Sequence, residues 1–454
     1  MKQTTIAAIR FGYGLGAGRL AGSAPDIMQS LRAADAMVSA YPLLSLAEAL
    51  ALRRNYFKTQ DAEASGDPEA VKAHEAARLA VADTSPILLR HVVARAVASP
   101  APFRERLHLF WLDHFTTRIR GGGETALAHS FADTALRATM TRRFADMLRA
   151  VVVHPQMLLY LDQTSSVGPG SVAGRRQNRG LNENLARELL ELHTLGVGGS
   201  YSQGDVMEMA ELLTGLQFRP KDGGFAFVAN HAEPGPETVL GRTYGGMRRG
   251  GLDAIFAALD DLSVHPDTAR HLARKLVVHF VSDRPDPALV AHVAARWRET
   301  DGDLMQVYDA LLEHPAAWGA LGGKAKQPLD FIISAFRALG MTGADVMALP
   351  RQPFQEMVVN ALAGMGQPFM RAPGPDGWKE ADEAWITPIG LSQRIRWAMR
   401  NPSRLVKPLP DPRDFVVQAL DDAATPQLIW AVGAADTVAQ GVGLVLASTE
   451  FNRR

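Results

Sequence analysis

Leu181-Asn-Glu-Asn-Leu-Ala-Arg-Glu-Leu-Leu-Glu-Leu-His-Thr-Leu-Gly196 is the stretch that decides the fold, because its leucines recur at helical spacing. At about 100° of rotation per residue they form one broad apolar face. Its members are Leu181, Leu185, Leu189, Leu192 and Leu195. Glu188 falls within the same arc, where a carboxylate needs a partner. The pattern therefore predicts a packed helix in which Glu188 is either functional or critical for packing.

Polar residues surround this apolar face. Asn184 and His193 lie at its two margins, and we keep both as candidates for binding a ligand or supporting Glu188. Glu183, Arg187 and Glu191 point away from the face at intervals of four residues, which is typical of a ladder of ion pairs in solvent. Arg187 is the member of that ladder that we also keep as a candidate site residue.

Composition excludes several classes of protein. The chain has 454 residues, 47% of them hydrophobic and 21% charged, which is ordinary for a globular protein. Its 48 basic and 48 acidic residues balance, so net charge gives no reason to expect nucleic acid as a partner. The absence of cysteine excludes disulfides and thiolate metal sites. We find no signal peptide and no apolar run long enough for a transmembrane helix, so a cytoplasmic location is the expectation.

Helical periodicity runs through most of the chain. It is interrupted between residues 217 and 250 by Gly, Pro and short alternating runs, which predict an irregular loop or a small β-hairpin. His-Pro dipeptides at His154, His265 and His314 stand near predicted helix starts, since proline fits a first helical turn. We predict a mostly α protein with one large helical body over residues 1–454. Helical subdomains over 1–200 and 251–454, joined by the irregular segment, are the alternative organisation.

A second helix, over residues 102–117, carries the other main candidate. Its aromatic and apolar face holds Phe103, Leu107, Phe110, Trp111 and His114. His114 is either a core residue satisfied by a carbonyl or carboxylate, or a metal ligand or general base. We predict that His114 and Glu188 meet, directly or through an ion or water, because each offsets the desolvation of the other.

A divalent metal is one extension of this centre. With His193 added, His114 and Glu188 could supply three ligands, although no His-Glu-x-x-His spacing supports such a site. Glu208 and Glu211 are also spaced like paired ligands, but they lie opposite the apolar face of their helix, and we expect them in solvent. His231, in the irregular segment, is a secondary candidate for ligand binding.

Two glycine-rich stretches do not match the motifs they superficially resemble. Residues 12–18 lack the spacing of a dinucleotide or phosphate loop. Residues 168–174 lack the Gly-x-Ser-x-Gly arrangement of a nucleophile elbow. A serine hydrolase is therefore unsupported.

Longer blocks of the sequence resemble one family. These are Glu105-Arg-Leu-His-Leu-Phe-Trp-Leu-Asp-His-Phe-Thr116, Asn182-Glu-Asn-Leu-Ala-Arg-Glu-Leu-Leu-Glu-Leu-His-Thr-Leu-Gly196, Asp205-Val206 with Leu213-Thr-Gly215, His265-Pro-Asp-Thr-Ala-Arg-His-Leu-Ala-Arg-Lys-Leu276, Gly364-Met-Gly-Gln-Pro-Phe369 and Pro375-Asp-Gly-Trp378. They are similar to the blocks of a bacterial family known as domain of unknown function eighteen hundred. The resemblance spans residues 8–398 and supplies no established reaction.

The resemblance implies further expectations. Family members are often encoded beside a sulfatase-like family of exported proteins, which implies such a protein as a partner, and export together with it. Several members carry export signals that this chain lacks. Ala232 stands where the family typically has aspartate, which weakens a ligand role for His231. The family blocks contain His114, Asn182, Glu183, Arg187, Glu188 and His193, the same helices that the periodicity singles out.

Two readings of function remain. In the first, the buried centre of His114, Glu188, Asn184 and His193 performs metal-assisted or acid/base hydrolysis, with Glu188 as ligand or base and His114 as ligand or orienting partner. In the second, the protein is a non-enzymatic accessory or binding protein that acts with the sulfatase-like partner, and the polar centre only specifies packing.

Overall fold

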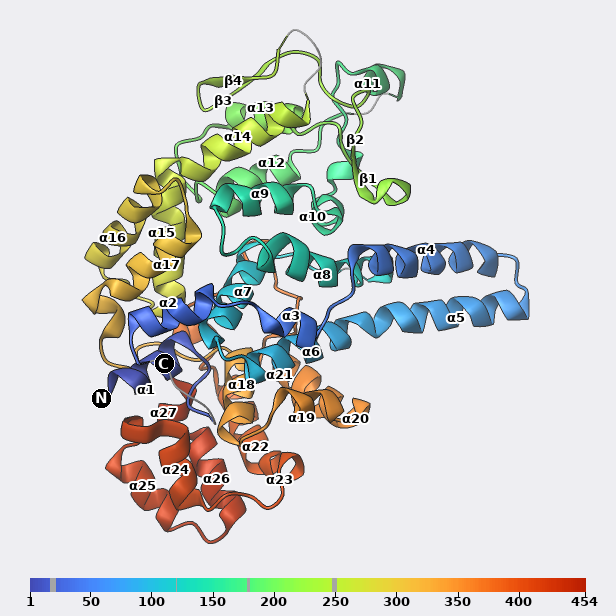
Figure 1. Ribbon diagram of the computed structural model, residues 1–454. Helices are drawn as coiled ribbons and strands as arrows, with labels where there is room; N and C mark the ends of the chain where they lie inside the picture. Colours follow the sequence, from blue (N-terminus) through green and yellow to red (C-terminus); the bar gives the residue numbers. More distant parts are fainter. Residues whose placement is uncertain (17–21, 120, 178–179, 247–250) are drawn as a thin grey trace.

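The computed structural model describes residues 1–16, 22–119, 121–177, 180–246 and 251–454. Helices dominate these residues, and the described strands form two small antiparallel sheets, which confirms the predicted mostly α class. Figure 1 shows an elongated body with the strands at one end and helices α24 to α26 at the other. The helices before the strands are α1 (Gln3–Ile6), α2 (Ala24–Arg32), α3 (Ala36–Ala40), α4 (Leu46–Glu63), α5 (Pro68–Ala82), α6 (Thr84–Ala98), α7 (Pro102–His114), α8 (Leu127–Ser130), α9 (Phe144–Val152), α10 (Pro155–Tyr160), α11 (Val172–Gln177), α12 (Asn184–Glu188) and α13 (Gln203–Leu212).

The helices after the strands continue the same architecture. They are α14 (Leu252–Val264), α15 (Pro266–Phe280), α16 (Pro287–Glu299), α17 (Leu304–Glu313), α18 (Pro328–Ala338), α19 (Gly343–Ala348), α20 (Arg351–Phe354), α21 (Asn360–Gly364), α22 (Pro388–Arg400), α23 (Pro402–Leu405), α24 (Pro412–Leu420), α25 (Pro426–Gly433), α26 (Val438–Ala447) and α27 (Thr449–Asn452). Wider π-helical turns follow several short helices, at η1 (Ala7–Phe11), η3 (Phe131–Arg137), η5 (Leu189–His193) and η8 (Gln355–Val359). Short 3₁₀ turns occupy Gly122–Glu124, Gln163–Ser165, Pro220–Asp222, Pro315–Trp318, Asp382–Ala384 and Asp421–Ala423.

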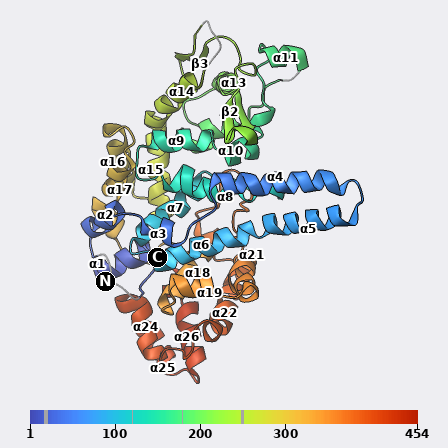
Figure 2. The ribbon, with the colours of Figure 1, turned by 45° about the vertical axis from the view of Figure 1, so that its right-hand side comes forward.

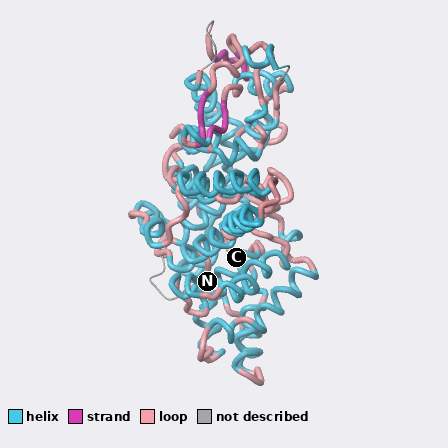
Figure 3. The backbone as a smooth tube through the Cα atoms, turned by 90° about the vertical axis from the view of Figure 1, so that its right-hand side faces the viewer, coloured by secondary structure: helices cyan, strands magenta, loops and turns pink. Residues whose placement is uncertain are grey.

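The segment predicted to be irregular contains two β-hairpins. Strand β1 (Leu216–Arg219) pairs with β2 (Gly224–Phe227), and Leu216 lies opposite Phe227. Strand β3 (Glu237–Val239) pairs with β4 (Arg242–Tyr244). Figure 3 shows these strands confined to one end of the molecule. The prediction of a small hairpin insertion is therefore confirmed.

The three His-Pro dipeptides start helical segments, as predicted. His154, His265 and His314 are N-cap residues of α10, α15 and the 3₁₀ turn Pro315–Trp318. In each, Nδ1 accepts a hydrogen bond from the backbone N–H two residues later, at 3.1, 3.1 and 3.2 Å. The imidazole thus satisfies one of the free N–H groups at the helix start. The chain from Phe144 to Tyr160 accordingly forms two helices, α9 and α10, which are divided at His154.

Helices α4 and α5 form an antiparallel hairpin that extends away from the body in Figures 1 and 2. The rest of the apolar interior forms two main clusters. The larger cluster draws on residues from Ala7 to Ala317, and the second combines Tyr13 and α6 with residues from Leu329 to Phe451. Helix α7 lies where these clusters meet, because its residue Leu109 packs against both.

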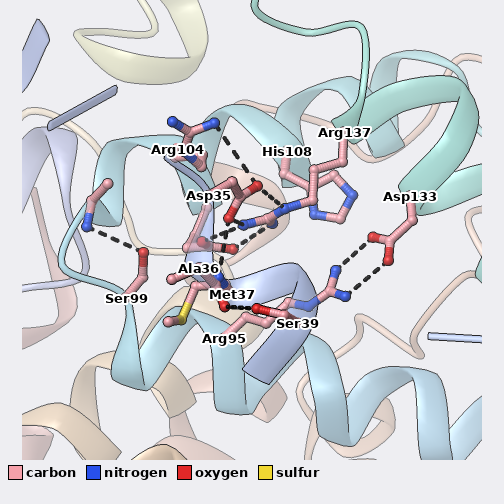
Figure 4. Close-up of polar contacts among 12 residues, drawn as sticks. Asp35, Ala36, Met37, Ser39, Arg95, Ser99, Arg104, His108, Asp133 and Arg137 are labelled. Atoms are coloured by element: carbon pink, nitrogen blue, oxygen red, sulfur yellow. Dashed lines mark hydrogen bonds and ion pairs between the residues drawn. The ribbon is translucent and has the colours of Figure 1, made fainter. Parts of the chain in front are cut away.

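Buried arginines fix the segment over residues 33–41, which follows α2 (Figure 4). Helix α3 has no buried residue, so apolar packing does not hold it in place. Instead, Arg137 pairs with Asp35 at 2.7 Å, and Arg104 donates to the carbonyl of Ala33 at 2.7 Å. Arg95 donates to the carbonyl of Tyr41 at 3.0 Å. Charge-assisted hydrogen bonds from the core therefore replace a hydrophobic contact here.

Candidate functional site

The predicted helix over 181–196 changes its winding at Glu188. Helix α12 ends there and the π turn η5 follows, in which Thr194 donates its hydroxyl to the carbonyl of Leu189 at 2.7 Å. A π turn adds a residue to one helical turn and often occurs at functional sites. The side chains after Glu188 therefore point in directions around the helix axis that a uniform rotation of about 100° per residue does not predict. His193 is 1% exposed, and its Nδ1 has no hydrogen-bond partner among the described residues.

His114 is buried as predicted, but its partners are not the predicted ones. Nε2 lies 3.2 Å from the carbonyl oxygen of His193, and Nδ1 lies 3.1 Å from Nζ of Lys275. An ammonium can only donate, so Nδ1 accepts and Nε2–H donates to the carbonyl. Burial, followed by the positive charge of Lys275, holds the pKa of His114 well below its usual value. Both ring nitrogens are thus engaged elsewhere, so His114 does not bond directly to Glu188, and a contact through an ion or water stays a prediction.

Burial keeps the neighbouring histidines neutral as well. Nε2 of His271 lies 3.3 Å from the carbonyl oxygen of Leu192, so His114 and His271 satisfy consecutive carbonyls at the end of η5. Burial lowers the pKa of His193 to about 3 and that of His271 to about 4. Within the described ranges, His114, Glu188 and His193 do not form a group of three close ligand atoms. The metal site predicted from these residues is therefore not assembled.

The outer candidates lie away from this cluster. Asn184 is exposed, which corrects its predicted place in a buried centre. Arg187 forms the predicted surface ladder, 2.9 Å from Glu183 and 3.2 Å from Glu191. His231 lies in the loop after β2, where its carbonyl oxygen accepts the N–H of Gly168 at 2.9 Å.

Glu188 lies partly out of solvent, on the helix face where the sequence places it. It is half-buried, and burial, followed by the charges of Glu191 and Asp376, raises its pKa to about 7. Asp376 belongs to the loop between α21 and α22. The carboxylate that the sequence places on an apolar face is thus partly buried, and the neighbouring charges that raise its pKa belong to other acids.

A separate group of carboxylates corrects a further expectation. Glu208 and Glu211 are half-buried rather than solvated, and Glu237 of β3 completes a group whose ligand atoms lie within 4.8 Å of one another. Burial and a hydrogen bond with Glu211 raise the pKa of Glu237 to about 8. A proton shared between these two carboxyl groups accounts for their proximity.

A cavity opens on another face of α7. Its empty space, together with open solvent at the mouth, is about 740 Å³. Most of the wall is apolar, and the loop after α21 closes one side with Phe369, Met370, Ala372 and Trp378. Thr116 lines it just after α7, and Arg106, Leu109 and Asp113 line it from the helix itself. Their spacing of three or four residues places them on one stripe of the helix.

Asp113 stands at one end of that stripe. Its carboxylate oxygens accept the backbone N–H of Trp378 at 3.0 and 3.2 Å. Burial raises the pKa of Asp113 to about 7, against the opposing effect of Lys275. Burial also lowers the pKa of Lys275, which Asp113, Glu380 and Asp376 oppose. This carboxyl group can therefore gain or lose a proton near neutral pH while in contact with the cavity.

Arg106 stands at the other end and belongs to a buried ionic network. Arg106 and Arg454 both pair with Asp330, the former at 3.3 Å. Arg106 also lies 3.2 Å from Nε2 of His279, whose Nδ1 is 2.6 Å from Glu380. Glu380 in turn pairs with Lys324 at 2.9 Å. We define the cavity floor as Tyr13, Arg106, His279 and Asp330, which line the cavity, together with Arg454, which pairs with Asp330.

Sequence reasoning missed the residues around this cavity. Asp113 adjoins His114 in the sequence, and Arg106 precedes Asp113 by two helical turns. The available signal was a second stripe of α7, with charged residues at both ends and leucine between them. It was overlooked because the aromatic stripe that contains His114 is stronger. Lys275 and Asp330 lie 161 and 224 residues from their α7 partners, a separation that periodicity cannot bridge.

Comparison with known proteins gives one match. The family model described as "Protein of unknown function (DUF1800)" matches residues 6–453. No curated protein and no solved structure matches the chain. No helix among the described residues is long and apolar enough to cross a membrane.

Proposed function

Because the chain belongs to the DUF1800 family, whose function is not known, we propose one from the geometry: it is an acid/base hydrolase of small, largely apolar molecules. The observation that carries this proposal is the position of Asp113. Its carboxyl group borders a largely apolar cavity, and burial raises its pKa to about 7. A general base works best when its pKa lies near the operating pH.

The reaction needs only this chain and water. The Asp113 carboxylate takes a proton from a water molecule in the cavity while the water oxygen attacks the carbonyl carbon of an ester. The protonated Asp113 then returns the proton to the leaving alkoxide as its bond to carbon breaks. Lys275, whose positive charge acts on Asp113, stabilises the negative charge that develops on the carbonyl oxygen. His114 positions Lys275 and takes no part in proton transfer.

The test is hydrolysis of 4-nitrophenyl butyrate by the full chain. Asp113→Asn keeps an oxygen that accepts the Trp378 N–H but cannot take up the proton. We expect kcat/KM to fall by about 100-fold or more, the usual contribution of a general base. In the wild type, kcat/KM should rise with pH through about 7, as Asp113 loses its proton.

Two further carboxylate variants keep the result interpretable. Glu191→Gln, in the surface ladder, is the matched control and should leave the rate unchanged. Glu188→Gln tests the rival assignment of the base from the sequence. The proposal is wrong if the wild type does not turn over the ester, if Asp113→Asn retains its rate, or if Glu188→Gln alone removes it. Circular dichroism and thermal melting establish that each variant is folded.

A further inference from the structure

The cavity floor contains a polar group that the protein leaves unsatisfied. Tyr13 is 1% exposed and lines the cavity, and its hydroxyl has no hydrogen-bond partner among the described residues. Burial, followed by the charge of Asp330, raises the pKa of Tyr13, so the hydroxyl keeps its proton. A buried hydroxyl without a partner costs free energy. It is therefore available as a donor to a molecule in the cavity.

Hydrogen-bond donors around Tyr13 outnumber their partners, and the Nε–H groups of Arg106 and Arg454 bond to no described residue. Asp330 is the carboxylate that Arg106 and Arg454 share, and Arg454 also donates to the carbonyl of His279 at 3.0 Å. Lys326 adds a buried amine nearby, whose pKa of about 7 reflects burial first. Glu380 and Asp283 both pair with Lys324, and Glu380 also opposes the charge of Arg454. The cavity floor thus has a surplus of donors, since the Nε–H of Arg106 bonds to no described residue.

The geometry of α7 sets the orientation of a ligand. Arg106 and Asp113 are seven residues apart, which corresponds to about 10 Å along a helix axis. Leu109 lies between them on the same stripe, and Leu362, Phe369 and Met370 supply apolar wall. A molecule held at both ends therefore has an apolar middle.

We propose that the substrate is an organic acid whose carboxylate binds Tyr13 and Arg106 at the cavity floor and whose apolar body extends along α7 toward Asp113. This inference rests on the proposed function, since it assigns the same cavity to the substrate. The bond to be hydrolysed lies at the Asp113 end. Carboxylate recognition by an arginine and a hydroxyl uses charge-assisted hydrogen bonds, which are stronger than neutral ones.

Calorimetric titration of the full chain tests the head group. The probes are octanoate and 4-phenylbutanoate, each compared with the alcohol and the amine that share its apolar body. We expect both carboxylates to bind at least about tenfold more tightly than their neutral and cationic analogues, because a hydrogen bond to a charged group is worth more than a neutral one. Equal or tighter binding of the analogues, or no binding of either carboxylate, overturns the inference.

Tyr13→Phe tests the place of the head group without disturbing the fold. It removes a hydroxyl that bonds to no described residue, so the melting temperature without ligand should stay the same or rise. Octanoate affinity should fall by about tenfold or more. Ser334→Ala is the matched control, because its hydroxyl is also buried and without a described partner but does not line the cavity. Unchanged octanoate binding in Tyr13→Phe contradicts the assignment.

The ester assay separates the two proposals. If Asp113-dependent hydrolysis is found but the carboxylates have no advantage, the substrate class is wrong and the proposed function stands. If the carboxylates bind with the expected preference but Asp113→Asn hydrolyses at the wild-type rate, the cavity binds organic acids without the proposed catalysis.

Discussion

Replacement of Gly377 by alanine should detach the loop that closes the cavity. Gly377 has a φ of +80°, and a Cβ there would lie 2.7 Å from the carbonyl oxygen of Asp113 and 2.9 Å from its carboxylate. The left-handed backbone costs an alanine about 1–2 kcal/mol. The contact with the α7 backbone adds about 1–3 kcal/mol, as overpacking does in cores. The sum is about 2–5 kcal/mol against the closed loop.

Gly366 supplies the matched control. It lies at the start of the same loop with a φ of +95°, but a Cβ there would meet nothing within 4 Å. Gly366→Ala therefore carries the backbone cost alone, about 1–2 kcal/mol. The difference between the two variants isolates the close approach of the loop to Asp113. It corresponds to about a 5- to 150-fold change in the equilibrium for loop opening.

Hydrogen exchange measured by mass spectrometry reads this equilibrium directly. The backbone N–H of Trp378 donates to Asp113, so its protection reports the closed loop. We expect peptides over residues 368–378 to lose more protection in Gly377→Ala than in Gly366→Ala, while α7 stays protected, because loops open locally. Equal protection in the two variants would refute the reasoning that Asp113 and Gly377 together hold the loop.

Three further outcomes are expected. Glu188→Gln should not change the melting temperature near pH 4.5 but should raise it increasingly toward pH 8. The reason is that the wild type loses stability as the pH rises through the folded-state pKa of Glu188, about 7. A constant difference in melting temperature across pH contradicts this. In denaturant titrations, Glu237→Gln should likewise keep its stability at alkaline pH. The wild type should lose stability there, because Glu237 shares a proton with Glu211 and has a pKa of about 8. Tyr308→Phe should lower the free energy of unfolding by about 1–3 kcal/mol, since the Trp111 indole N–H, now 2.7 Å from the Tyr308 hydroxyl, would be buried without a partner; an unchanged unfolding curve would contradict that.

The local patterns in the sequence were sufficient for the helices and hairpins. The aromatic stripe of α7 is buried as its spacing predicts, and the alternation after residue 216 forms strands. Periodicity failed at Glu188, because a uniform step of 100° cannot represent the π turn that follows. The extra residue in that turn brings the carbonyl of His193 to His114. His114 and Glu188, the two polar residues that the sequence places on apolar faces, therefore lie in different environments.

Asp113 and His114 show why a correct helix can still give the wrong site. As neighbours in the chain they differ by about 100° around α7, so one faces the cavity and the other faces the histidine cluster. Lys275 connects the two environments, because it donates to Nδ1 of His114 and its charge opposes the rise in the pKa of Asp113. Replacement of His114 should therefore affect the pKa of Asp113 by displacing the Lys275 amine. Removal of His114 should shift the pH at which Asp113 titrates, a result that loss of a proton-transferring histidine would not produce.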